Sequence, residues 1–303
     1  MEMSLTDECR VLSIQSTVVS GYVGNKSAAF PLQVLGFDVS MINSVQFSNH
    51  TGYGKFKGQV LNASDVECLY DGLKENNLLW YTHLLTGYIG SKSFLEEVGR
   101  IIQNLKKINP SLVYVCDPVM GDHGKMYVPS ELLPVYRETI LPLADIITPN
   151  QFEIELLTGR KIESEEDVRL AMEDLHSMGP QTVVISSSNL GSNGHIISMA
   201  STVKNGTKER FKIEFPHIPA IFVGTGDLFA ACLLAWMQTD NNLQLALEKT
   251  ISTLQAVIKR TNIFALEKAG PGNKPNSAQM ELRLVQSKSD IENPTILYKA
   301  KPF

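Results

Sequence analysis

The sequence predicts an α/β fold, a single doubly wound domain with a mostly parallel central sheet flanked by helices and with antiparallel edge strands. Three observations predict it. Short apolar runs alternate with amphipathic segments, which is typical of βαβ units. The 303 residues suit one large α/β domain. No low-complexity linker and no internal repeat divides the chain, so residues 1–303 are expected to form a single domain.

The strands are expected in short apolar runs bounded by polar residues. In chain order these runs cover residues 9–14, 38–43, 81–85, 112–116, 146–148, 182–186 and 195–200. The polar stretch 201–210 and the apolar run 211–215 predict an antiparallel hairpin with the last of them. Near residues 281–286, apolar and polar side chains alternate, which predicts a final edge strand.

Helices are expected between the strands, where apolar residues recur every three or four positions. Pro110 ends a helix whose apolar face is formed by Phe94, Val98, Ile101, Leu105 and Ile108. A later helix shows the same spacing at Leu247, Ile251, Leu254 and Ile258. The glycine- and proline-rich residues 268–278 are expected to form a surface loop.

The composition excludes several classes of function. The net charge is −5 and the charges are interleaved, so a nucleic-acid surface is not expected. No apolar run is long enough to span a membrane, and residues 1–10 do not resemble a signal peptide. The four cysteines are scattered and lack zinc-ligand spacing, which indicates reduced thiols. A cytoplasmic protein is therefore expected.

The most informative motif is Gly224-Thr225-Gly226-Asp227, which directly precedes an apolar helix. The glycines permit a tight turn that a ligand can approach, and the first amides of a helix lack intrahelical partners. Such amides suit an anion that gains negative charge during a reaction. Asp227 would then be placed to act as a general base. The alternative is an ordinary turn in which Asp227 caps the helix, worth about 1 kcal/mol.

Further polar motifs follow the predicted strands, at the edge where doubly wound sheets bind ligands. Ser16 follows the first strand. Asp117 and Asp122 flank a turn after the strand 112–116, and this pair could hold Mg²⁺ through its waters. A turn in which the two carboxylates cap backbone amides is the alternative.

Two more strand ends carry polar groups. Thr148 ends the strand 146–148, and Asn150 and Glu153 then have the spacing of a capping box that starts a helix. The same two side chains could contact nucleotide phosphates, because a capped helix end is rigid. Ser186 ends the strand 182–186 and could contact phosphate or an alkali cation, although a plain loop is the alternative. Neither a P-loop motif nor a dinucleotide-binding glycine motif occurs.

Taken together, these residues resemble the ribokinase-like superfamily, and within it the pyridoxal kinase family, from about residue 10 to residue 289. Gly-Thr-Gly-Asp is typical of the superfamily. Residues 43–53, with the sequence NSVQFSNHTGY, are similar to its vitamin B6 branch. Other similar stretches are residues 13–16, 21–25, 30–36, 85–88, 117–122 and 148–153.

The resemblance implies ATP-dependent transfer of the γ-phosphoryl to the 5′-hydroxyl of pyridoxal, pyridoxine or pyridoxamine. It implies Mg²⁺ and a monovalent cation, K⁺ or Na⁺, as cofactors, and a homodimer. It also implies that Asp227 is the base and that the anion hole is formed by Gly224, Thr225 and Gly226.

The resemblance also implies the binding residues. The vitamin would be contacted by Ser16, Val23, Phe47, Thr51, Tyr88 and Tyr127. ATP would be contacted by Asp117, Asn150, Glu153, Ser186, Ser187, Ile218, Pro219, Ala220 and Thr225. Mg²⁺ would be held by Asp117, Asp122 and Glu153, and the monovalent cation by Thr148 and Ser186.

Three positions depart from the family pattern. Thr17 stands where vertebrate members commonly have His, the segment 122–127 is shorter than in those relatives, and Ser186 stands where Thr is usual. None removes a residue that the transfer chemistry requires. Two other functions stay open: a kinase for hydroxymethylpyrimidine or a small sugar, and a B6- or nucleotide-binding protein with little catalysis.

Overall fold

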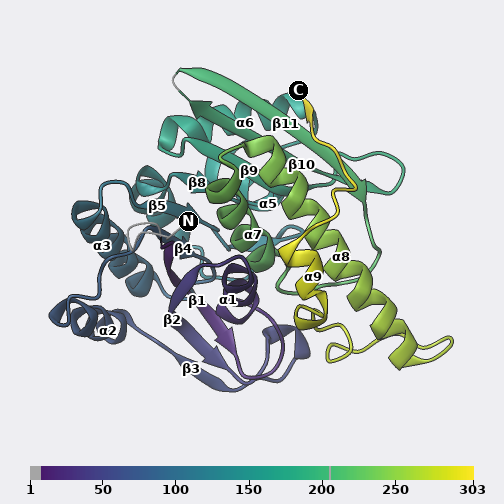
Figure 1. The fold of residues 1–303 in the computed structure, drawn as a ribbon, viewed down its shortest axis with the longest axis horizontal. Helices are drawn as coiled ribbons and strands as arrows, with labels where there is room; N and C mark the ends of the chain where they lie inside the picture. The colour runs from purple at the N-terminus through teal and green to yellow at the C-terminus, as the bar shows by residue number, and fades with distance from the viewer. Residues whose placement is uncertain (1–7, 205) are drawn as a thin grey trace, which may run out of the picture.

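The centre of the fold is a sheet of ten strands in the order β12-β11-β10-β9-β8-β5-β4-β1-β2-β3 (Figure 1). The structure is a computed structural model that describes residues 8–204 and 206–303. The strands of this sheet are β1 (Arg10–Val18), β2 (Asp38–Phe47), β3 (Gly58–Val60), β4 (His83–Thr86), β5 (Val113–Cys116), β8 (Ile146–Ile147), β9 (Thr182–Ser188), β10 (His195–Lys204), β11 (Thr207–Pro216) and β12 (Lys301–Pro302).

The predicted α/β fold is confirmed. The six central strands, from β9 to β2, are parallel to their neighbours, and the strands outside them pair antiparallel. The predicted hairpin is formed by β10 and β11. Cys116 of β5 pairs with Thr86 of β4 and with Ile147 of β8, so these strands end level with one another. The residues that follow them therefore lie side by side.

Helices cover both faces of the sheet (Figure 1). The longer ones are α1 (Asn25–Val34), α2 (Ala63–Glu75), α3 (Lys92–Ile108), α5 (Gln151–Thr158), α6 (Glu165–Met178), α7 (Thr225–Asp240) and α8 (Leu243–Ala269). Shorter helical segments are η1 (Thr51–Tyr53), α4 (Leu132–Val135), η2 (Tyr136–Ile140), η3 (Leu141–Leu143), η4 (Val285–Ser287) and α9 (Lys288–Glu292), and a separate hairpin pairs β6 (Gly121–Asp122) with β7 (Lys125–Met126).

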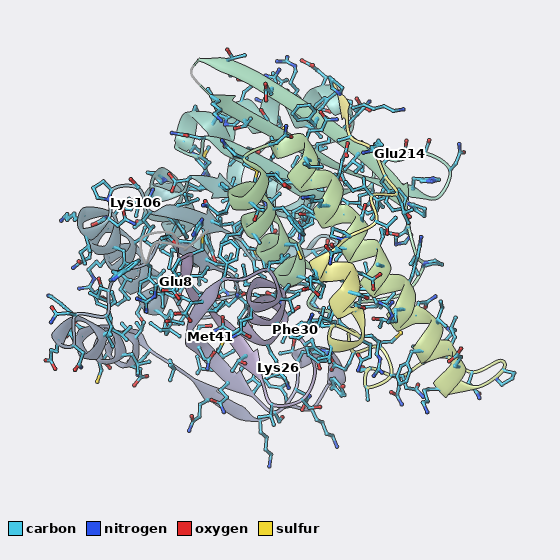
Figure 2. All side chains as sticks on the ribbon, in the orientation of Figure 1. Glu8, Lys26, Phe30, Met41, Lys106 and Glu214 are labelled. Atoms are coloured by element: carbon cyan, nitrogen blue, oxygen red, sulfur yellow. The ribbon has the colours of Figure 1, made fainter. Side chains whose placement is uncertain are left out.

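Two apolar layers hold the helices on the sheet. In β1, Leu12 and Ile14 pack with α2, α3, α5 and α6, whereas Val11 packs with α1, α7 and α8. Strand side chains alternate between faces, so a strand buried on both sides is apolar throughout. Figure 2 shows side chains filling both layers, while charged groups such as Glu214 on β11 lie at the periphery.

Most predicted elements are present, with different ends. The helix predicted to end before Pro110 is α3, and the later apolar spacing belongs to α8. Polar residues extend three strands beyond their apolar cores, namely β1, β2 and β9. Ser16, which was expected to follow its strand, consequently lies within β1, and Ser186, which was expected to end its strand, lies two residues before the end of β9.

The predicted edge strand at residues 281–286 is wrong. This segment is irregular and then enters η4, and the edge strand beyond β11 is β12. Leu282 and Leu284 are both buried in the apolar layer that contains α7 and α8. Packing of every second residue against helices produces the same alternation as a strand, so the pattern alone was ambiguous. In the described residues, no helix is long and apolar enough to cross a membrane.

Candidate active site

The site is centred on the first turn of α7. Gly224 is the N-cap residue, with a φ of 86° that favours glycine, and no side chain caps the helix amides. A Cβ on Gly224 would lie 2.0 Å from the carbonyl oxygen of Tyr22. The N-terminus of α7 is thus pressed against residues 21–24, and its free amides open beside them.

Asp227 lies in this first turn but does not cap it. Its Oδ2 accepts a hydrogen bond of 2.8 Å from the amide of Gly24, and the N-cap position belongs to Gly224. The alternative of an ordinary N-cap aspartate is therefore wrong. A Cβ on Gly24 would lie 1.9 Å from the carbonyl oxygen of Ser16 and 2.5 Å from its Oγ. Ser16, Gly24 and Asp227 consequently form one compact group.

Asp117 lies beside this group, directly after β5. Its side chain is 5% exposed, and its Oδ1 accepts a hydrogen bond of 3.3 Å from Oγ1 of Thr148. Its Oδ2 would be 3.7 Å from a Cβ on Gly226. The level ends of β5 and β8 thus place Asp117 and Thr148 against the N-terminus of α7.

Glu153 and Asn150 form the predicted capping box at the start of α5. The Glu153 carboxylate accepts the amides of Asn150 and Met120, both at 2.9 Å, and that of Gly121 at 3.5 Å. The Asn150 amide group donates to the carbonyl oxygen of Gly121 at 2.8 Å. The cap therefore also fixes the turn after Asp117 and the β6–β7 hairpin.

The three carboxyl groups affect one another. Burial raises the pKa of Asp117 well above its usual range, and the charges of Glu153 and Asp227 raise it further. Burial raises the pKa of Glu153 to about 7, although three backbone amides oppose this shift. Asp227 is partly exposed, and burial raises its pKa although the hydrogen bond from the Gly24 amide opposes this shift.

These buried carboxylates fit a divalent cation. Within the described residues, Asp117 and Glu153 have no Lys or Arg as an ion-pair partner, so no positive side chain offsets their mutual repulsion when both are ionised. No group of three His, Cys, Asp or Glu side chains suited to a metal occurs among the described residues. This donor set suits Mg²⁺, which keeps several waters and uses one or two carboxylates together with substrate phosphates.

The residues expected to contact the vitamin come from several separate segments of the chain. Val23 is buried, Tyr88 is partly buried after β4, and Phe47 ends β2. Thr51 begins η1 and is exposed. Its neighbour Gly52 would place a Cβ 4.0 Å from the Val223 side chain, so the loop that carries Thr51 meets the segment entering α7.

Tyr127 follows the β6–β7 hairpin and is 54% exposed. Its amide donates to the carbonyl oxygen of Met120 at 2.8 Å. The turn of the hairpin has positive φ angles at His123 and Gly124, and Asp122 lies at its base. The segment 122–127 thus contains a small hairpin that is tied to the Asn150 cap.

Most of the residues expected to contact ATP lie near the ends of β8 and β9 and in one loop. The Ser186 amide donates to the carbonyl oxygen of Pro149 at 3.0 Å, next to Thr148, and partly buried Ser187 follows in β9. Ile218, Pro219 and Ala220 lie in the loop between β11 and α7.

Sequence reasoning missed two residues that contact this site. The Gly24 amide is the hydrogen-bond donor to Asp227, and Glu281 binds the neighbouring Tyr22 amide. The spacing of Gly21 and Gly24 near the end of the first strand could have indicated a tight backbone segment there. Glu281 gives no comparable local signal, because its partner Tyr22 is 259 residues away.

The chain matches known proteins over nearly its whole length. Residues 80–273 match the phosphomethylpyrimidine kinase family model. A pyridoxal kinase of Ovis aries is 57% identical over 98% of this chain and 99% of its own, and one of Arabidopsis thaliana is 54% identical over 98% and 96%.

Solved structures agree with these relatives. A pyridoxal kinase from Leishmania donovani in complex with ADP and pyridoxamine superimposes with a TM-score of 0.90 at 34% identity, covering 98% of this chain and 100% of its own. The chain therefore belongs to the pyridoxal kinase family, a family of phosphotransferases.

Proposed function

We propose that this protein transfers the γ-phosphoryl group of ATP to the 5′-hydroxyl of pyridoxal, and also of pyridoxine and pyridoxamine. The observation that carries the proposal is the position of Asp227 in the first, uncapped turn of α7. An acceptor alcohol there would have a base on one side and helix amides on the other. The Leishmania donovani relative was solved with ADP together with pyridoxamine and with pyridoxine, which supports this choice of substrates.

Asp227 acts as the general base in this proposal. Its Oδ2 is held by the Gly24 amide, and within the described chain no hydrogen bond occupies its Oδ1, so Oδ1 is available to take the proton of the alcohol. Burial raises the pKa of Asp227, which makes the carboxylate a stronger base. The resulting alkoxide attacks the γ-phosphorus, the bond to the β-phosphate oxygen breaks, and ADP leaves.

The backbone amides from Gly224 to Asp227, at the start of α7, would stabilise the negative charge on the transferring group. These donors are fixed before the substrate arrives, so no reorganisation is needed during the reaction. Asp117, Asp122 and Glu153 would hold Mg²⁺ through its waters, and the ion would supply further positive charge to the phosphates. Thr148 and Ser186 would hold the monovalent cation, K⁺ or Na⁺.

The remaining proposed contacts follow the same geometry. Ser16 and Thr51 would hydrogen-bond the pyridine ring, and Tyr127 would close over it. The ring faces would be lined by Val23, Phe47 and Tyr88. ATP would be bound by Asn150 and Ser187, with its adenine beside Ile218, Pro219 and Ala220.

The assembly and location of the protein are also part of the proposal. We propose a homodimer in the cytoplasm, and that residues 1–303 form a single domain. Met41, Val60 and Leu69 are exposed near β3, an edge of the sheet, which supports a partner there because grouped apolar side chains favour association. One continuous sheet with strands from Arg10 to Pro302 supports a single domain. Sedimentation of the purified protein measures the oligomeric state.

Asp227→Asn provides the decisive test of the chemistry. The variant keeps the shape of the side chain but cannot accept the proton, so turnover is expected to fall roughly 10²–10⁴-fold while ATP still binds. The measurement is ADP formation with pyridoxal and Mg·ATP, alongside nucleotide affinity by calorimetry. Near-normal turnover in Asp227→Asn would exclude the role of general base.

A second acceptor is favoured by one observation, the match to the phosphomethylpyrimidine kinase family model. The same base and amides would serve a kinase for hydroxymethylpyrimidine. Assays of pyridoxal, pyridoxine, hydroxymethylpyrimidine and ribose with Mg·ATP, with and without K⁺, separate these acceptors. A pyrimidine preference would replace the proposed substrate and leave the role of Asp227 intact.

A further inference from the structure

Glu281 is a partly buried acid that the proposed chemistry does not use. Its side chain is 13% exposed and lies in the irregular segment between α8 and η4. Its Oε2 accepts the amide of Tyr22 at 3.0 Å, and its Oε1 accepts the hydroxyl of Tyr53 at 2.8 Å. His50 Nε2 lies 3.5 Å from the same Oε1. One carboxylate therefore joins three chain segments.

The first of its partner segments leads to the general base. A Cβ on Gly21 would lie 2.3 Å from Oε1 of Glu281, so only glycine lets the carboxylate rest on this backbone. The φ of 97° at Gly21 has the same requirement. Three residues later, the Gly24 amide donates to Asp227. Glu281 and Asp227 thus hold the two ends of residues 21–24, which include Val23.

The second partner segment carries Thr51. His50 Nδ1 accepts the Gly52 amide at 3.1 Å, so Nε2 is the nitrogen that bears a hydrogen and points at Glu281. The ring of Tyr53 packs edge-on against His50 with centroids 4.7 Å apart. Both side chains that flank Thr51 are therefore directed at the same carboxylate.

Neutral donors satisfy this acid. In the described part of the chain, no Lys or Arg lies within ion-pair distance of Glu281, whose contacts are an amide, a phenol and an imidazole. Burial lowers the pKa of His50 while the Glu281 charge raises it. The carboxylate accepts hydrogen bonds from two loops, so it can hold these loops in a fixed position relative to each other.

We propose that Glu281 is a positioning residue for the vitamin side of the site. It fastens residues 21–24 to residues 50–53, and through the Gly24 amide it sets the place of the Asp227 carboxylate. This inference rests on the proposed function, because it assumes that these two segments enclose the phosphoryl acceptor. Within the described residues, the polar contacts of Glu281 do not include Asn150, Glu153 or Ser186, which are proposed to face the nucleotide.

The test compares Glu281→Gln with wild-type protein in two separate titrations, one of pyridoxal and one of Mg·ATP. Glutamine keeps the size of the side chain but offers a single acceptor oxygen, so one partner faces an NH₂ group. We expect kcat/KM for pyridoxal to fall roughly 10–100-fold, since small misplacements of reacting groups are costly. The KM for Mg·ATP is expected to stay within about twofold.

Two further variants support the comparison. Tyr53→Phe removes one donor to Glu281 and keeps the ring, so it should give a smaller loss that is again confined to pyridoxal. Glu267→Gln alters an exposed acid of α8 and should behave as wild type. Thermal unfolding of each variant identifies any loss that is merely a loss of folded protein.

The outcomes separate this inference from the proposed function. If the wild-type protein phosphorylates pyridoxal and both Glu281→Gln and Tyr53→Phe do so with unchanged kinetics, the positioning role alone is overturned. Equal losses for pyridoxal and Mg·ATP would also overturn it. A wild-type protein that neither binds nor phosphorylates pyridoxal would overturn both.

Discussion

At the scale of single residues, the proposed mechanism needs one base and fixed hydrogen-bond donors. Asp227 is held through one oxygen, so its second oxygen keeps a defined direction without being consumed by a protein hydrogen bond. The burial that raises its pKa has a cost in stability, because the charged form loses hydration. Buried groups with shifted pKa values are common at active sites, where the group is needed for the reaction.

Thr51→Val tests the ring contact at the same scale. Valine keeps the shape of threonine and removes the hydroxyl, so only a hydrogen bond of about 0.5–1.5 kcal/mol is lost. We expect the KM for pyridoxal to rise roughly 3–10-fold and the KM for Mg·ATP to stay unchanged. Thr207→Val, at an exposed position of β11, is the matched control. Equal effects on both substrates would count against a ring contact.

Residue spacing allowed part of the site to be predicted. Asn150 and Glu153 are three positions apart, so their capping box follows from local sequence and is present. Asp117 and Thr148 follow buried strands, and parallel pairing brings them together. Glu281 could not be found in this way, because its partners are more than 200 residues away and no periodic pattern connects them.

At the scale of elements, the start of α7 depends on Gly224. Its left-handed backbone turns the chain into the helix, and its missing Cβ lets the helix approach the carbonyl oxygen of Tyr22. Ser27 of α1 donates to the Gly224 carbonyl oxygen at 2.9 Å, which ties the same turn to a second helix. The anion-binding amides are therefore positioned by packing between elements as well as by the helix itself.

Gly224→Ala is expected to disrupt this turn. A Cβ 2.0 Å from a backbone oxygen forces the helix end to move, and a shift of this kind should lower turnover at least about 100-fold. Gly36→Ala is a matched control, because Gly36 has a φ of 87° but nothing within 4 Å of its Cβ position. That variant should lose about 1 kcal/mol of stability and keep its activity. Comparable kinetics in the two variants would refute the steric argument.

The strands could be predicted only in part from the sequence. The apolar cores of the strands were identified because a buried parallel strand needs them, but their polar ends were not. Those ends carry Ser16, Phe47 and Ser186, which are proposed to face ligands rather than the apolar layers. The segment 281–286 was misread because its alternation arises from contact with α7 and α8, a long-range feature.

At the scale of the whole molecule, the fold gathers negative charge at one edge of the sheet. Asp117, Glu153 and Asp227 come from three distant parts of the chain, and the level strand ends bring them together. Without a cation they repel one another in a buried setting. These carboxylates are therefore expected to lower the free energy of unfolding of the ligand-free protein, as is common at the active sites of enzymes.

Asp117→Asn tests this cost through its dependence on pH. The pKa of Asp117 is higher in the folded state than in the unfolded state. The protonated side chain therefore contributes its whole stabilisation below the unfolded pKa, and this stabilisation is lost as the pH rises through the folded pKa. Asparagine has no such loss and keeps an oxygen for Thr148. We expect the ligand-free variant to unfold at a higher temperature than wild type, by a margin larger at about pH 8 than at about pH 5.

The measurement is the Tm of both proteins across this pH range without Mg²⁺ or nucleotide. Asp71→Asn, at an exposed position of α2, is the control and should follow wild type at every pH. Turnover of Asp117→Asn should fall although its stability rises, because the variant lacks one of the carboxylates proposed to hold Mg²⁺. If the Tm of Asp117→Asn at about pH 8 is equal to or below that of the wild type, the buried carboxylates do not destabilise the fold by repelling one another. The stability of this edge would then have to come from elsewhere in the fold.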